Sequence, residues 1–284
     1  MKNKKSVGIT QLAYKLPSHR VTLDKLESDH KIASPAKLMR EFGFEDAYIE
    51  EKTDHLNQLI IEAGEEVLKK SKIPPAEIDS LFLYSGLSNI ISKQPKDEKQ
   101  TLELFRYPVA EAKYKLGLTR AKTTATSQQG CSGLLSTIFL ASQLMEASEQ
   151  EKILCLTGDA LPSDAPREIM YNIMSDAGAA LLLETNATKN RIVHFHEQQQ
   201  PYYWDTPNHK DELLASYFPM AERAISNCLK EAGLSVADIG WFVPHNVSLR
   251  SWKILADLLH VPMEKIWTNF ITRRWLFGTK IIAM

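Results

Sequence analysis

Short apolar runs alternate with longer amphipathic stretches along most of this 284-residue chain. Runs of aliphatic and β-branched residues predict buried strands, and apolar residues that recur every three to four positions predict helices. The expected strands cover residues 7–13, 80–85, 153–157, 179–184 and 241–243, and the expected helices cover residues 53–71, 102–116, 132–147, 213–232 and 249–259. This alternation predicts an α/β protein with a largely buried sheet.

Residues 186–209 differ in composition from their surroundings, with three consecutive glutamines and two prolines. Such a composition is typical of a strand or two leading into a connector. We therefore place the boundary between two halves near residue 188. The first half is residues 1–188 and the second is residues 189–284.

The two halves share a weak internal repeat. A helix end, a turn with an acidic residue and an apolar run occur at residues 68–82 and again at residues 229–243, with Leu68 matching Leu229 and Ile78 matching Ile239. The offset is 161 positions at both pairs. Two copies indicate a duplicated βαβ-type fold with pseudo-twofold symmetry, although helix–turn–strand units also share such patterns by chance.

Composition and charge exclude several function classes. Lys and Arg number 34 against 35 Asp and Glu, so the net charge of −1 does not favour binding to nucleic acid or to an anionic membrane. The sequence has neither a signal-peptide core nor an apolar run long enough to span a membrane, so we expect a cytoplasmic protein. Its three widely spaced cysteines match neither a disulfide framework nor a zinc site.

Cys131 is the strongest candidate nucleophile. It lies between Gly130 and Ser132-Gly133, directly before an apolar helix. A turn of small residues at a helix N-terminus exposes the sulfur, and the helix dipole and the N–H groups stabilise a thiolate. The alternative is that Cys131 is a packing residue, which is the ordinary role of an unpaired cysteine. For Cys155, in a strand, and Cys228, in a helix, packing is the favoured interpretation.

His245 is the second candidate. It follows Pro244 at the end of an expected strand, and ligands of α/β sheets bind at the carboxyl ends of strands. A loop or core histidine is the plainer interpretation. The His194-x-His196 pair could bind a metal, but the sequence offers no obvious further ligand, so we predict no metal site.

Three motifs occur in one order: Gln129-Gly130-Cys131-Ser132-Gly133, Ser175-Asp176-Ala177-Gly178-Ala179-Ala180 and Pro244-His245-x-x-x-Leu249-Arg250. Together they resemble the β-ketoacyl-acyl carrier protein synthase III family of the thiolase superfamily. The resemblance implies a thiolase fold, with duplicated halves in a layered α-β-α-β-α arrangement. It also implies a cytoplasmic homodimer.

The resemblance implies an acyltransferase of fatty acid or polyketide biosynthesis. Cys131 would accept an acyl group from an acyl-CoA or acyl carrier protein thioester, and the enzyme would condense it with a malonyl-type thioester. His245 would hydrogen-bond the carbonyl of the second substrate. Arg250 would help to dock the carrier protein, although an ordinary solvated helix charge is an equal alternative. No cofactor is implied beyond the coenzyme A or phosphopantetheine of the substrates.

The sequence also departs from the family pattern. The third catalytic position, an Asn in most members, falls at Trp275, where an indole cannot accept a hydrogen bond. Asn269 lies nearby and could take this role. Relatives continue past this loop, so we expect the second half to be truncated at its end. The alternative hypothesis is a catalytically impaired relative that binds acyl groups or only self-acylates, and a third is an unrelated protein in which Cys131 is core packing.

Overall fold

A five-stranded mixed sheet forms the centre of the first half. The computed structural model describes residues 5–50, 56–86, 96–103, 105–243 and 247–268. The strands lie in the order β1-β9-β6-β4-β5. They are β1 (Val7–Lys15), β4 (Ser80–Tyr84), β5 (Lys122–Thr126), β6 (Lys152–Asp159) and β9 (Ala177–Thr185). The pairs β4–β5 and β4–β6 are parallel, whereas β6–β9 and β1–β9 are antiparallel.

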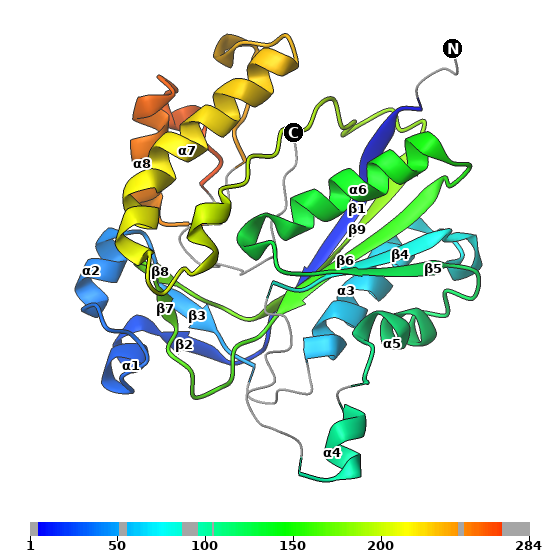
Figure 1. Cartoon of the computed structure of the whole chain (residues 1–284), viewed down its shortest axis with the longest axis horizontal. Coiled ribbons are helices and arrows are strands. Elements are labelled where there is room, and N and C mark those ends of the chain that lie inside the picture. Colours follow the sequence, from blue (N-terminus) through cyan, green and yellow to red (C-terminus); the bar gives the residue numbers. More distant parts are fainter. Residues whose placement is uncertain (1–4, 51–55, 87–95, 104, 244–246, 269–284) are drawn as a thin grey trace.

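Helices cover both faces of this sheet (Figure 1), because alternate side chains of each central strand point to opposite faces. Leu81, Leu83 and Leu154 pack against α3 (Leu56–Ser71) and α5 (Pro108–Lys115). Phe82 and Cys155 pack on the other face, against α6 (Gly133–Ala147). The central strands are therefore apolar on both faces, which is typical of a buried sheet.

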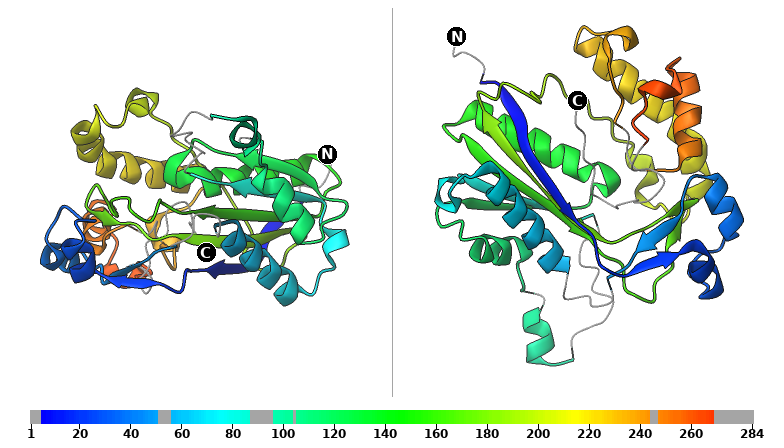
Figure 2. Two further views of the ribbon diagram at one scale, coloured as in Figure 1. Left: turned by 90° about the horizontal axis from the view of Figure 1, so that it is seen from below. Right: turned by 180° about the vertical axis from the view of Figure 1, so that it is seen from behind.

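A smaller unit is attached to the first half, as the two further views show (Figure 2). Its core contains Leu23, Leu26 and Met39, which are fully buried. Its elements are β2 (Arg20–Thr22), α1 (Leu23–Ser28), α2 (Ala36–Glu41), β3 (Asp46–Tyr48), β7 (Glu168–Ile169) and β8 (Asn172–Ile173), and α4 (Glu98–Glu103) lies apart from them.

The second half repeats the local geometry of the first. After α3, the 3₁₀ helix η2 (Pro75–Glu77) leads into β4, and after α7 (Lys210–Glu231) the 3₁₀ helix η5 (Val236–Asp238) leads to Phe242. The Glu77 N–H donates a hydrogen bond to the Pro74 carbonyl, and the Asp238 N–H donates one to the Ser235 carbonyl. The two donors are 161 positions apart in the sequence, and so are the two acceptors. The structure thus supports the internal repeat.

The second half contains α8 (Leu249–Leu258) and the 3₁₀ helix η6 (Met263–Lys265) as well, around a core that includes Trp252 and Leu255. The prediction of a strand at residues 241–243 is wrong, because the pairing there is limited to one residue. Within the described residues only one isolated parallel bridge forms, between Phe242 and Ile266. A single bridge does not supply the ladder that a strand needs on its neighbour.

Two further predictions are wrong. The helix expected over residues 102–116 is instead α4 and α5, and Pro108 stands in the first turn of α5, where a missing N–H is tolerated. A strand or two was expected after residue 186. The structure has instead one bridge between Gly8 and Arg191, followed by coil and the 3₁₀ helix η4 (Pro201–Trp204). The other helices, and the strands of the first half, are confirmed, although the start predicted at residue 53 lies outside the described residues.

Candidate functional site

Cys131 lies in a short 3₁₀ turn, η3 (Gly130–Ser132), that leads directly into α6. The backbone reverses sharply before it, with φ values of 63° at Gln128 and 48° at Gly130. Glycine adopts this left-handed conformation without the steric cost that a β-carbon brings. The turn leaves Cys131 partly exposed at the N-terminus of α6, as the sequence predicted. Amide N–H groups and the positive end of the helix dipole lie at such a terminus, and both favour a thiolate.

Tyr84, the last residue of β4, lies directly beneath this turn. Its side chain is fully buried, and its hydroxyl donates a hydrogen bond to the carbonyl of Gly130. The ring packs so closely on Gly133 that a β-carbon there would lie 1.9 Å from the ring. Glycine at the first position of α6 is therefore what allows the tyrosine to reach the cysteine turn.

The buried carboxylate of Asp159 acts electrostatically on Tyr84. Asp159 ends β6 and accepts hydrogen bonds from the Ser85 hydroxyl at 2.8 Å and from the Gly86 N–H at 3.2 Å. Burial raises the pKa of Tyr84, and the negative charges of Asp159 and of Cys131 raise this pKa further. The phenol is therefore a neutral hydrogen-bond donor at physiological pH.

Tyr217, on α7 of the second half, is affected by the charge of the same cysteine. Burial raises its pKa to about 12, and the charge of Cys131 contributes to this rise. The charge of Cys131 therefore acts on a side chain of the second half.

His245, Asn269 and Trp275 lie outside the described residues, so their roles stay predictions. The residues on both sides of His245 are placed. Phe242 forms the bridge to Ile266, and Ser248 accepts a hydrogen bond from the Ser251 N–H at 3.1 Å as the N-cap of α8. The Ser248 N–H donates to Asn172 Oδ1 at 3.1 Å, which ties this part of the second half to the β7–β8 hairpin.

The motif at residues 175–180 begins with a buried ion pair. Asp176 Oδ1 accepts from Arg167 Nη1 at 2.6 Å and from the Leu161 N–H at 3.0 Å, and Oδ2 accepts from the Glu50 N–H at 2.7 Å. Gly178 of the same motif faces α3, since a β-carbon there would lie 2.5 Å from the backbone of Leu59. The motif therefore fixes loops and allows α3 to pack tightly on the sheet.

Arg250, the predicted carrier-protein contact, is exposed near the start of α8. Its guanidinium lies over the ring of Phe42, 5.3 Å from the centroid, and Phe42 contacts Tyr171 edge-to-face. Such a cation–π contact holds the stem of the arginine without removing its charge from solvent. The structure leaves the docking role of Arg250 a prediction.

The remaining cysteines and the histidine pair have other surroundings. All three cysteines are thiols rather than disulfides. Cys155 is fully buried in the sheet, and burial raises its pKa, which fits the packing role expected for it. His194 and His196 both contact Glu231, at 3.0 Å each. Among the described residues, no group of three or more potential ligands is arranged to hold a metal ion.

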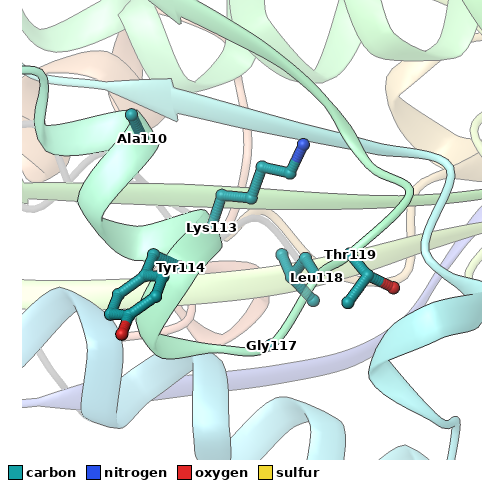
Figure 3. Close-up of a pocket in the computed structure, with 6 residues that line it drawn as sticks. All are labelled: Ala110, Lys113, Tyr114, Gly117, Leu118 and Thr119. Atoms are coloured by element: carbon teal, nitrogen blue, oxygen red, sulfur yellow. The ribbon is translucent and has the colours of Figure 1, made fainter.

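One surface hollow lies away from these residues (Figure 3). It has a volume of about 340 Å³ and is formed by the end of α5 and the turn that follows it. Its lining comprises Ala110, Lys113, Tyr114, Gly117, Leu118 and Thr119. Neither Cys131 nor Arg250, the predicted site residues that the structure describes, lines it, so we do not assign the candidate site to this hollow.

Known proteins are similar to this chain in both of its halves. The model of 3-oxoacyl-[acyl-carrier-protein] synthase III matches residues 127–201, and the model of its C-terminal region matches residues 229–273. The β-ketoacyl-[acyl-carrier-protein] synthase III of Porphyra purpurea is 23% identical over 274 residues, covering 85% of this chain and 76% of the relative. The chain is therefore similar to the synthase III family in both of its halves.

Solved structures share the fold. The 3-oxoacyl-(acyl carrier protein) synthase III of Pseudomonas aeruginosa PAO1 has a TM-score of 0.76 at 16% identity, over 96% of this chain and 86% of the other. The priming β-ketosynthase of the R1128 polyketide pathway has a TM-score of 0.75 at 17% identity, over 98% and 86%. The expected thiolase fold is therefore confirmed. The hypothesis of an unrelated protein is wrong.

The first family match begins four residues before Cys131 and contains the whole motif at residues 175–180, whereas Tyr84 lies before it. Reasoning from the sequence missed Tyr84, Asp159 and Tyr217. The position of Tyr84 at the carboxyl end of a predicted strand was an available signal, because site residues gather there. No sequence signal marks Tyr217, because the effect of the Cys131 charge on it depends on how the halves pack. In the described part of this chain, no helix has the length and apolar character to cross a membrane.

Proposed function

We propose that this chain is a synthase III-type condensing enzyme that accepts an acyl group on Cys131. The observation that supports this most directly is the position of Cys131 at the N-terminus of α6, within the segment that the family model matches. A partly exposed thiol at a helix N-terminus, next to backbone N–H groups, suits attack on a thioester.

In the proposed acylation, the Cys131 thiolate attacks the carbonyl carbon of an acyl-CoA or acyl carrier protein thioester. A bond forms between the cysteine sulfur and this carbon, and the carbonyl oxygen becomes an oxyanion that the Cys131 N–H stabilises. Collapse of this intermediate breaks the bond to the carrier sulfur. The proton lost by Cys131 ends on the departing thiol, so the step needs no bound cofactor.

In the proposed second half-reaction, a malonyl-type thioester binds and loses carbon dioxide. The resulting enolate carbon attacks the acyl group on Cys131, and the cysteine sulfur leaves. We propose that His245 hydrogen-bonds the thioester carbonyl and so stabilises the enolate. A third polar group at Asn269 or Trp275 remains a prediction.

We also propose that two copies of the chain associate along β5. The outer edge of this strand has no strand partner among the described residues, and residues 122–125 are exposed. Tyr107, the N-cap of the adjoining α5, is 64% exposed, and Tyr114 on that helix is 86% exposed. An unpaired edge with exposed aromatic residues beside it favours pairing with another chain. Light scattering should give the mass of two chains.

The acylation step is tested by mixing the protein with an acyl-CoA and measuring its intact mass. We expect the wild-type protein and Cys155→Ala to gain one acyl group, and Cys131→Ala to gain none. Cys155→Ala is the matched control, because it removes a thiol that is fully buried in the sheet. An adduct that survives Cys131→Ala, or no adduct on the wild-type protein, would contradict the proposal.

The alternative of an impaired relative that only self-acylates makes a different prediction for the second half-reaction. The family matches favour the condensing enzyme, because they extend over both halves and the curated relatives are named as synthases. Release of a 3-oxoacyl product from the acylated protein separates the two hypotheses.

A further inference from the structure

The peptide group between Gly130 and Cys131 carries two functional atoms. Its carbonyl accepts the hydrogen bond from the Tyr84 hydroxyl, and its N–H is the oxyanion donor in the proposed acylation. A trans peptide is planar, so its carbonyl and its N–H point in opposite directions. Whatever fixes the direction of the Gly130 carbonyl therefore also fixes the direction of the Cys131 N–H.

The orientation of this peptide depends on hydrogen bonds to its carbonyl, because Gly130 itself is conformationally free. Gly130 has a φ of 48°, and glycine rotates between left-handed and right-handed conformations at little cost. Two donors hold its carbonyl. One is the N–H of Gly133, which closes the 3₁₀ turn, and the other is the Tyr84 hydroxyl. The first bond is local to the turn, whereas the second ties the turn to the centre of the sheet.

Tyr84 is itself rigidly held. It pairs with Thr126 on one side and with Thr157 on the other, as part of the parallel ladders of β4. Its ring is buried and contacts Gly133, so the side chain has little freedom to rotate. Because its phenol stays protonated, it can donate to the carbonyl throughout the physiological range of pH. A donor at a carbonyl also polarises the peptide, which strengthens its N–H as a donor.

We propose that Tyr84 is a positioning residue for the oxyanion hole, holding the 130–131 peptide so that the Cys131 N–H stabilises the acylation intermediate. This inference rests on the proposed function. It assigns to β4 a role in transition-state stabilisation, in addition to its role in the core. In this role Tyr84 acts through the peptide and not through a contact with the substrate.

Tyr84→Phe tests the proposal, because it keeps the ring and removes only the hydroxyl. Two rates are measured for each variant: acylation by an acyl-CoA, and alkylation by iodoacetamide. Both need the Cys131 thiolate, but alkylation displaces iodide from a saturated carbon and forms no oxyanion. Loss of a direct oxyanion donor costs about 10²–10³ in rate, so we expect a smaller loss, about tenfold, when the donor is only misdirected.

Thr137→Val is the matched control. Thr137 is buried one turn further into α6, where its hydroxyl donates to the Gly133 carbonyl at 2.7 Å and contacts the Thr126 hydroxyl at 2.8 Å. The substitution removes a buried hydroxyl from the same helix but leaves the 130–131 peptide bonded to Tyr84. We expect the ratio of acylation to alkylation to stay within about twofold of wild type, because no oxyanion donor is affected.

A tenfold fall in the acylation-to-alkylation ratio for Tyr84→Phe alone would support the proposal. An unchanged ratio, or an equal fall in Thr137→Val, would overturn it. A wild-type protein that is alkylated but never acylated would refute the proposed function and this inference with it. Because that result is seen in the wild-type protein, it can be distinguished from an effect confined to Tyr84→Phe. If Tyr84→Phe does not fold, Gly133→Ala supplies the test, since the added β-carbon displaces the Tyr84 ring and should lower the same ratio.

Discussion

Replacing Asp176 by Asn should destabilise the protein strongly. The side chains of Arg167 and Asp176 are 0% and 1% exposed, so neither charge can be solvated when the other is lost. Asp176 uses both carboxylate oxygens, one for Arg167 and the Leu161 N–H and the other for the Glu50 N–H. An asparagine has one oxygen, so its NH₂ group must face at least one of these donors.

The expected loss in the free energy of unfolding follows from the burial of the Arg167–Asp176 ion pair. Removing one member of a buried ion pair costs about 3–5 kcal/mol, chiefly because the other charge stays buried without compensation. The free energy of unfolding of a typical domain is about 5–15 kcal/mol, so this loss is a large fraction of it. We therefore expect a clearly lower urea midpoint for Asp176→Asn, measured by tryptophan fluorescence.

Asp164→Asn is the matched control, because Asp164 lies exposed in the segment that precedes Arg167. It should change the free energy of unfolding by no more than about 0.5 kcal/mol. The double variant Arg167→Met with Asp176→Leu removes both charges and should recover much of the loss. An Asp176→Asn protein within about 0.5 kcal/mol of wild type would refute the reasoning from burial.

Three further predictions concern other parts of the molecule. Gly178→Ala should cost about 1–3 kcal/mol in urea unfolding, because its β-carbon would lie 2.5 Å from the backbone of α3; no loss would contradict the packing. Hydrogen bonds from Lys15 and then Lys70 lower the pKa of Glu66 from 4.5 to about 2, so its stabilising contribution is present above pH 4.5 and lost as the pH falls through 2. Glu66→Gln should therefore be less stable than wild type at pH 7 and equally stable near pH 2, and a constant difference would refute this. Arg250→Glu should raise KM for a carrier-protein substrate several-fold without changing KM for the acyl-CoA, and equal effects on both would argue against docking.

The sequence predicted the buried parts of the sheet well. The strands β4, β6 and β9 are continuous apolar runs, because helices cover both of their faces, and such runs are visible without a structure. The strand β5 was not predicted. Its residues 122–125 are exposed and include a lysine and two threonines, so no apolar pattern marks it as part of a sheet.

The candidate site was predictable only where a local motif carries it. The Cys131 turn is encoded by small residues next to an apolar helix, and the structure places it at the head of α6 as expected. The contact of Tyr84 with this site depends on the packing of β4 against the turn, which no local pattern records. Ser248 illustrates the same point, because its role as the N-cap of α8 is local, whereas its contact with Asn172 is not.

The most direct test of the central claim is a single turnover with acyl-loaded protein. The wild-type protein is first acylated and freed of excess acyl-CoA, and a malonyl thioester is then added while the intact mass and the products are followed. We predict that the mass returns to that of the unmodified chain as a 3-oxoacyl thioester and carbon dioxide appear in equal amounts. An acyl group that stays on Cys131, or that leaves only as the free acid, would contradict the assignment as a condensing enzyme.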